Sequence, residues 1–277
     1  MNASFKNFDL TGKTAYITGG GTGLGYVMAR GLSRLGATVM MAARREDVLR
    51  ERAEALSAET GNKVLYATID LSNPGNIAAS AERAIVTLKG VDIFIGNAGQ
   101  DGLELIDRTT EAVVDDLFQV NVQSNISLVR LFLPHMRSKK WGRVLFSSSF
   151  TTRRGSPHEG FGAYAATKNG LNAFARVAAC EAGHDGITFN SLILGTYMTD
   201  IMRGVIAGID KEHGAGAGQA FLNTVASMTA LGRLGQPDEV ESIVQLLASD
   251  AGSYITGAEI PIDGGMSITM KPNMPSQ

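Results

Sequence analysis

Tyr164 and Lys168 stand four residues apart in the segment YAATK. On a helix, residues with this spacing project from the same face, so the phenol and the ammonium would lie side by side. A free tyrosine has a pKa of about 10, and a neighbouring ammonium favours the phenolate, which brings that pKa toward the range where a proton carrier works best. The pair therefore predicts a tyrosine that passes a proton and a lysine that stabilises its charged form.

A glycine-rich segment near the start of the chain predicts a site for the pyrophosphate of a dinucleotide. The sequence TGGGTGLG follows an expected strand and opens an expected helix. Glycine lacks a Cβ and lets the backbone approach a phosphate, and the helix N-terminus adds partial positive charge. A tight strand-to-helix turn alone could also use these glycines. The cofactor contacts expected here are Gly19, Gly21, Thr22, Gly23, Leu24 and Gly25.

The end of the second expected strand favours NADP(H) over NAD(H). A site for NAD(H) places an acidic residue there for the adenosine ribose, but this sequence has Ala43. Arg44, and with it Arg45, can instead pair with a 2′-phosphate, because guanidinium is a forked donor suited to phosphate oxygens. The alternative is a solvated pair of arginines at a helix start, and it applies more to Arg45 than to Arg44.

Two further loops follow expected strands and could contact the adenosine. After the third strand, Asp70 and Leu71 can bring a carboxylate and a backbone amide to the adenine ring. After the fourth, Asn97, Ala98 and Gly99 can lay a small backbone surface against the adenosine. Either could be only the beginning of a loop.

Strand and helix patterns alternate along the chain, which predicts βαβ units and a parallel sheet. No linker, charge block or repeat interrupts this order, so we expect residues 1–277 to form one doubly wound α/β domain with helices on both faces of the sheet. The helices are expected at about 23–35, 46–60, 75–88, 111–137, 161–182 and 238–249. The seven strands are expected at 13–18, 37–42, 63–69, 91–96, 142–149, 186–193 and 258–262.

Residues 196–230 break the alternation between the sixth strand and the last helix, and they include the glycine-rich run 214–218. Connections of this length often cover binding sites, so we expect a mobile substrate cover. Apolar residues in and near it suggest a medium-sized hydrophobic substrate, although they could equally pack the cover onto the domain. They are Phe150, Tyr197, Met198, Met202, Val205, Ile206 and Phe221.

The composition, 44% hydrophobic and 19% charged over 277 residues, is typical of a folded protein with a sizeable core. A formal net charge of -2 gives no broad attraction to nucleic acid or to anionic membranes. A single cysteine, Cys180, excludes an internal disulfide, and no Cys/His spacing resembles a metal site. No apolar run reaches the roughly 18 residues of a membrane span, nor does the N-terminus resemble a signal peptide. We expect a cytoplasmic protein.

Together, these motifs resemble the short-chain dehydrogenase/reductase family over nearly the full chain. The matching elements occur in order: TGGGTGLG, the NAG of 97–99, Asn121, a serine-rich strand end, YAATK and the IDGG of 262–265. The resemblance implies a Rossmann-type fold, a nicotinamide cofactor, hydride transfer to or from carbon, and a homotetramer (or homodimer).

The resemblance also implies a serine that binds the substrate oxygen. Ser147, Ser148 and Ser149 end the fifth expected strand, and alternation places Ser147 and Ser149 on one face. We choose Ser149, which is closest to the edge of the sheet where ligands bind, with Ser148 as the alternative. Asn121 matches the asparagine that in the family holds a water between Lys168 and solvent, and an amide that fixes a helix kink is the other interpretation.

In the implied mechanism, Ser149 and Tyr164 hold the carbonyl oxygen, NADPH delivers hydride, and Tyr164 donates the proton. Lys168 stabilises the phenolate and binds the nicotinamide ribose. This describes an NADP(H)-dependent enzyme that interconverts a ketone and a secondary alcohol on a hydrophobic small molecule. Alternatives are a 3-oxoacyl thioester reductase, a 2,4-dienoyl-CoA reductase, whose branch lacks the tyrosine, and a dinucleotide-binding sensor without catalysis.

Two segments depart from the family pattern. Leu194 replaces the proline after the sixth strand, in the turn whose residues Gly195, Thr196 and Thr199 the resemblance assigns to the nicotinamide amide or the phosphates. The connection 150–163 is longer than in the family and carries unusual charge. An acidic group of the substrate could bind there, or the charges could belong to a solvated loop or a subunit contact. The residues concerned are Arg153, Arg154 and His158.

Overall fold

Seven parallel strands form a single sheet in a computed structural model that describes residues 3–155 and 159–269. The order is β3-β2-β1-β4-β5-β6-β7, so the direction of strand addition reverses between β1 and β4. In doubly wound sheets, ligands bind at the carboxyl edge beside such a reversal. The strands are β1 (Thr14–Thr18), β2 (Thr38–Ala43), β3 (Val64–Thr68), β4 (Ile93–Gly96), β5 (Gly142–Ser149), β6 (Ile187–Leu194) and β7 (Glu259–Ile262).

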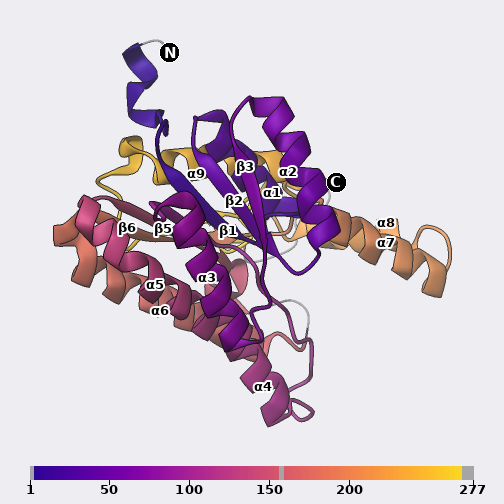
Figure 1. Ribbon diagram of the computed structural model, residues 1–277. Helices are drawn as coiled ribbons and strands as arrows, with labels where there is room; N and C mark the ends of the chain where they lie inside the picture. The colour runs from indigo at the N-terminus through magenta and orange to yellow at the C-terminus, as the bar shows by residue number, and fades with distance from the viewer. Residues whose placement is uncertain (1–2, 156–158, 270–277) are drawn as a thin grey trace.

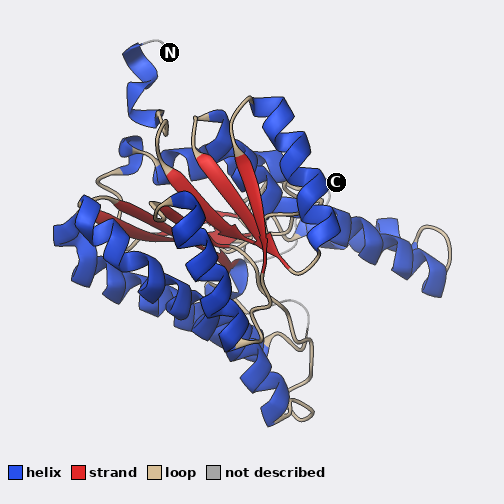
Figure 2. Ribbon diagram, in the orientation of Figure 1, coloured by secondary structure: helices blue, strands red, loops and turns tan. Residues whose placement is uncertain are grey.

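Helices cover both faces of the sheet, as Figure 2 shows. One apolar core joins the sheet to α1 (Gly23–Arg34), α2 (Glu46–Thr60) and α9 (Glu241–Ala248). The other joins it to α3 (Pro74–Leu88), α5 (Ser124–Lys139) and α6 (Gly162–Ala182). Because both faces are covered, β4, β5 and β6 are buried at every position, as expected for central parallel strands. The predicted Rossmann-type fold is confirmed.

The stretch expected as one helix over 111–137 is helical throughout but has three parts. After α4 (Glu111–Phe118), residues Gln119–Gln123 form a π-helix, and α5 follows directly. A π-turn holds one more residue than an α-turn and often occurs at functional sites. Here it contains Asn121, whose side chain is fully buried.

The excursion at 196–230 contains two helices that the sequence pattern did not indicate. They are α7 (Asp200–His213) and α8 (Ala217–Ser227), which pack against each other and project from the body of the domain (Figure 1). Thr199 caps α7, since its hydroxyl accepts the N–H of Met202 at 3.4 Å. Motion of this helical pair stays a prediction. Within residues 3–155 and 159–269, no helix is both long and apolar enough to span a bilayer.

Candidate active site

The Asn97 side chain joins the ends of three neighbouring strands at the carboxyl edge of the sheet. Its Nδ2 donates to the Thr18 carbonyl at 3.1 Å, and its Oδ1 accepts from the Ser147 hydroxyl at 3.0 Å. The Thr18 hydroxyl in turn accepts the N–H groups of Asn97 and Ala98, each at 3.1 Å. The Asn97 side chain is therefore engaged within the protein.

The glycine turn after β1 has the backbone that its sequence predicts. Gly19 and Gly23 have φ angles of 68° and 55°, in a region that residues other than glycine rarely adopt. A Cβ on Gly25 would lie 2.2 Å from the Gly19 carbonyl oxygen, so only glycine fits there. Thr22 precedes α1 without a side-chain cap, so the first N–H groups of α1 have no partner from it. The turn thus fits a phosphate group.

Arg44 and Arg45 lie exposed between β2 and α2. Within the described part of the chain, neither guanidinium makes a hydrogen bond or an ion pair. Two exposed cations at the carboxyl edge of the sheet suit an anionic group such as a 2′-phosphate. Their contact with a cofactor stays a prediction.

The loop after β3 has its own internal contacts. The Asp70 carboxylate accepts from the N–H of Ser72 at 3.0 Å and from its hydroxyl at 2.8 Å, and these bonds hold the Asp70 pKa below its usual value. The carbonyl of Leu71, which is buried, accepts from Gln119 Nε2 at 3.0 Å. These contacts fix the loop beside the expected adenine site.

Ser149 and Tyr164 come together at the carboxyl edge, where β5 ends and α6 begins. The Ser149 hydroxyl lies close enough to the phenol to influence its pKa, and it accepts the N–H of Thr151 at 3.2 Å and the Thr151 hydroxyl at 3.0 Å. Burial raises the pKa of Tyr164, the Ser149 hydroxyl lowers it, and the negative charge of Asp101 raises it further. Asp101 follows the NAG loop by two residues, and the sequence analysis did not single it out.

Lys168 lies one turn further along α6 and is only 4% exposed. Its Nζ donates to the Ser147 carbonyl at 2.9 Å and lies 5.6 Å from the centroid of the Tyr164 ring. No carboxylate among residues 3–155 and 159–269 pairs with it, and burial lowers its pKa to about 8. The expected side-by-side placement of phenol and ammonium is thus observed, but the expected lowering of the Tyr164 pKa is wrong, because burial raises it.

The fully buried Asn121 side chain fixes the loop after β4. Its Oδ1 accepts the Gln100 N–H, and its Nδ2 donates to the Gln100 carbonyl, both at 2.9 Å. Nδ2 also lies 3.1 Å from the Thr167 hydroxyl on α6. A Cβ on Gly99 would lie 3.0 Å from Asn121 Oδ1 and 3.1 Å from Lys168 Nζ. The structure therefore brings all four predicted catalytic residues to one place, and their roles stay predictions.

The turn after β6 is tightly packed at its start and lies near the glycine turn further on. A Cβ on Gly195 would lie 2.6 Å from the Asp263 Cα, and the Thr196 carbonyl accepts a backbone N–H from the loop before α9 at 3.0 Å. The Thr199 methyl group, in contrast, would lie 3.7 Å from a Cβ on Gly23. A cavity of about 160 Å³ opens here, lined by Thr22, Gly23, Tyr26, Arg52, Met198, Thr199, Asp200, Arg203 and Pro237.

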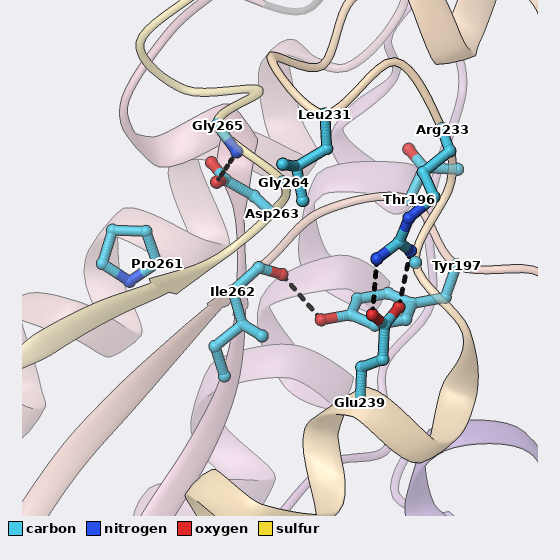
Figure 3. Close-up of a pocket in the computed structure, with 11 residues that line it drawn as sticks. Thr196, Tyr197, Leu231, Arg233, Glu239, Pro261, Ile262, Asp263, Gly264 and Gly265 are labelled. Atoms are coloured by element: carbon cyan, nitrogen blue, oxygen red, sulfur yellow. Dashed lines mark hydrogen bonds and ion pairs between the residues drawn. The ribbon is translucent and has the colours of Figure 1, made fainter.

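A larger cavity of about 330 Å³ lies beside the end of β7 (Figure 3). The four catalytic candidates do not line it. Its polar groups are paired within the protein: Arg233 with Glu239, the Tyr197 hydroxyl with the Ile262 carbonyl, and the Asp263 carboxylate with the Gly265 N–H. Tyr197 is therefore engaged here, in the core formed with α1, α2 and α9, and not on a substrate surface.

Arg153 and Arg154 have partners that the sequence analysis did not foresee. Arg153 Nη2 donates to the Glu259 carbonyl at 3.0 Å and lies 3.6 Å from its carboxylate. Arg154 Nη1 donates to the carbonyls of Met266 and Thr269. Both guanidinium groups thus hold the C-terminal part of the chain. The third residue considered for an acidic substrate group, at position 158, lies outside the described residues.

An apolar cluster joins Phe150, just after β5, to residues of the 196–230 excursion. Four of the residues expected near a hydrophobic substrate belong to it, whereas Val205 on α7 is 42% exposed. Phe150, one of the four, directly follows Ser149. The cluster comprises Val225, Leu234 and Met266, with Phe150, Met198, Met202, Phe221, Leu222, Ala226 and Met228 packed against them.

The chain is similar to known proteins over most of its length. A family model described as enoyl-(acyl carrier protein) reductase matches residues 19–267. L-rhamnose 1-dehydrogenase (NADP(+)) of Thermoplasma acidophilum is 31% identical over 95% of this chain and 99% of its own. The 3-oxoacyl-[acyl-carrier-protein] reductase FabG of Pseudomonas aeruginosa is 34% identical over 93% and 98%. The structure of L-sorbose reductase from Gluconobacter frateurii, complexed with NADPH and L-sorbose, has a TM-score of 0.90 at 27% identity, over 95% and 100%.

Proposed function

Since this chain belongs to the short-chain dehydrogenase/reductase family and is an oxidoreductase that acts on CH–OH and C=O groups, we propose that it interconverts a ketone and a secondary alcohol on a hydrophobic small molecule with NADP(H). One observation carries the proposal. The Ser149 hydroxyl lies near the Tyr164 phenol, and the buried Nζ of Lys168 lies 5.6 Å from the centroid of the same ring.

The two hydroxyls provide paired donors for one substrate oxygen. A carbonyl oxygen placed between Ser149 and Tyr164 accepts two hydrogen bonds, which stabilise the negative charge that develops on it. Tyr164 then donates its proton to this oxygen as the alcohol forms. The Lys168 ammonium beside the ring favours the phenolate that remains. In the direction of alcohol oxidation, the phenolate accepts the proton.

The glycine turn and the arginines after β2 fit NADP(H). When bound, the reduced cofactor supplies the hydride for the carbonyl carbon. An ammonium has three donors, and among the described residues Lys168 uses one of them, on the Ser147 carbonyl, so the others suit the ribose hydroxyls. Ala43 in place of an acidic residue supports a 2′-phosphate. The NADP(+) in the name of the rhamnose dehydrogenase and the NADPH bound to the sorbose reductase support the same choice.

The apolar cluster that includes Phe150 supports a hydrophobic substrate. A 3-oxoacyl thioester is the second candidate, supported by the 34% identity to a 3-oxoacyl-[acyl-carrier-protein] reductase. A dinucleotide-binding sensor without catalysis would have no need of the neighbouring Ser149 and Tyr164 hydroxyls and the buried lysine, so we rank it last.

The deciding experiment is a substrate panel followed by NADPH absorbance, with NADH in parallel. It covers ketones, secondary alcohols and 3-oxoacyl thioesters. Tyr164→Phe should lower kcat by about a thousandfold, while Kd for NADPH stays within about twofold because the ring remains. Tyr254→Phe is the matched control, since that side chain is fully exposed. Full activity of the Tyr164 variant, or cofactor binding without any turnover across the panel, would refute the proposal.

A homotetramer (or homodimer) in the cytoplasm completes the proposal. Exposed apolar side chains support self-association, among them Tyr254 near β7 and Val177 on α6, which is 59% exposed. Light scattering of the purified protein gives the assembly size directly.

A further inference from the structure

The Arg154 guanidinium reaches the C-terminal turn, which we define as residues 263–269. Its Nη1 donates to the Met266 carbonyl at 2.7 Å and to the Thr269 carbonyl at 2.9 Å. Arg154 lies five residues beyond Ser149, whereas the turn directly follows β7. One cation thus connects the loop after the catalytic strand to the last described residues of the chain.

The C-terminal turn is organised from its first residue. The Asp263 carboxylate accepts the N–H of Gly265 at 2.9 Å, drawn in Figure 3, and the N–H of Ser267 at 2.8 Å. The Gly265 carbonyl accepts the N–H groups of Ile268 at 3.2 Å and Thr269 at 3.1 Å. These bonds satisfy amide donors of the turn.

Arg154 binds two carbonyls of this turn. A hydrogen bond from a charged donor is stronger than a neutral one. The Arg154 side chain therefore holds the C-terminal turn against the loop after β5.

The turn brings a methionine into the apolar cluster. Met266 is only 2% exposed and belongs to that cluster with Phe150, Met198 and Phe221. Phe150 directly follows Ser149, so under the proposed function this side of the cluster would form a wall of the substrate site. The position of the Met266 side chain in that wall depends on the turn that Arg154 holds.

The neighbouring arginine makes a different connection. Arg153 binds the carbonyl and the carboxylate of Glu259 on β7, and that carboxylate also pairs with Arg176. Glu259 belongs to the sheet, and none of these three residues is part of the apolar cluster. Arg153 is therefore a matched control for Arg154, with the same side chain at the next position.

We infer that Arg154 is a positioning residue that holds Met266 in the substrate wall and thereby sets the size of the apolar substituent that the site accepts. The inference rests on the proposed function for its substrate, but the contact itself can be tested without turnover. Arg154 acts through Met266 and touches neither the reacting atoms nor the cofactor.

The test compares Arg154→Met, Arg154→Lys and Arg153→Met with the wild-type enzyme. In hydrogen–deuterium exchange of the NADPH-bound protein, the amides of residues 265–269 should exchange about tenfold faster in Arg154→Met. They should be unchanged in Arg153→Met and intermediate in Arg154→Lys, which keeps the charge. Unchanged exchange in Arg154→Met would overturn the inference.

A second measurement tests selectivity. Across straight-chain methyl ketones of increasing length, Arg154→Met should change the ratio of kcat/KM for long over short ketones by about fourfold, the effect of one methylene contact. The change should lie in KM, with kcat nearly constant, and Arg153→Met should keep the wild-type ratio. An unaltered ratio in Arg154→Met would overturn the inference. If the wild-type enzyme reduced no ketone, the proposed function would fail, and the exchange experiment would still decide whether Arg154 holds the turn.

Discussion

Asn121 holds the backbone of Gln100 at both of its polar groups, so that one side chain on the π-helix fixes the loop that faces Tyr164 and Lys168. Asn121→Ala leaves these backbone groups without their partner, which should cost about 1–3 kcal/mol of unfolding free energy and lower kcat. Urea unfolding and steady-state kinetics measure the two effects.

Asn172, a buried asparagine on α6, provides the control for that prediction. Both side-chain polar atoms of Asn172 are buried without a hydrogen-bond partner in the described chain. Asn172→Leu should therefore be neutral or stabilising and leave kcat unchanged. Equal losses of stability in the two variants would contradict the stabilising role of the hydrogen bonds between Asn121 and Gln100.

Ser149 and its neighbour Ser148 should differ sharply when each is replaced by alanine. Ser149 lies beside Tyr164, so Ser149→Ala should lower kcat/KM by about a hundredfold through loss of one donor to the substrate oxygen. The buried Ser148 hydroxyl has no partner among the described residues, so Ser148→Ala should keep activity and stability. The reverse result in the kinetic assay would make Ser148 the catalytic serine.

Asp101 should shift the pH dependence of the reaction through Tyr164. Its negative charge raises the Tyr164 pKa, so Asp101→Asn should lower that pKa. Alcohol oxidation requires the phenolate, and its rising limb in kcat/KM against pH should move to lower pH in the variant. Asp107→Asn, in the same exposed loop, should leave the profile in place. Superimposed wild-type and Asp101→Asn profiles would exclude this coupling.

Arg44 should control the choice between the two nicotinamide cofactors. Arg44→Ala loses the bonds to a 2′-phosphate. It should therefore raise KM for NADPH by about 10- to 100-fold and leave KM for NADH nearly unchanged. Arg45→Ala should have a smaller effect, and Arg50→Ala, an exposed position on α2, should have none. An equal rise of KM for both cofactors would show that Arg44 does not recognise the phosphate.

Features that depend on neighbouring residues could be predicted from the sequence. The strand Gly142–Ser149 has the predicted bounds, because its apolar run and its serines are local. Tyr164 and Lys168 share a face of α6 for the same reason. The π-turn at Asn121 could not be predicted, since the periodicity over 111–137 stays helical through it. The contacts of Arg154 join segments more than a hundred residues apart, and no local pattern encodes them.

The buried Lys168 lowers the stability of the folded protein. In the unfolded chain its pKa has the ordinary value of 10.5, and in the folded protein it is about 8. The free energy of unfolding is therefore reduced at pH 7, by an amount on the order of 3 kcal/mol. It recovers as the pH rises from about 8 to 10.5. Lys168→Met removes the charge and loses the bond to Ser147, worth about 1 kcal/mol.

That variant should be inactive and yet melt at a higher temperature than the wild type near neutral pH, as calorimetry can measure. The gain should shrink toward pH 10, and a lower melting temperature at pH 7 would contradict it. Catalysis and thermal robustness are thus in direct competition at one side chain, as in proteins that retain a costly group for their function. Selection for heat resistance alone would favour the loss of this lysine.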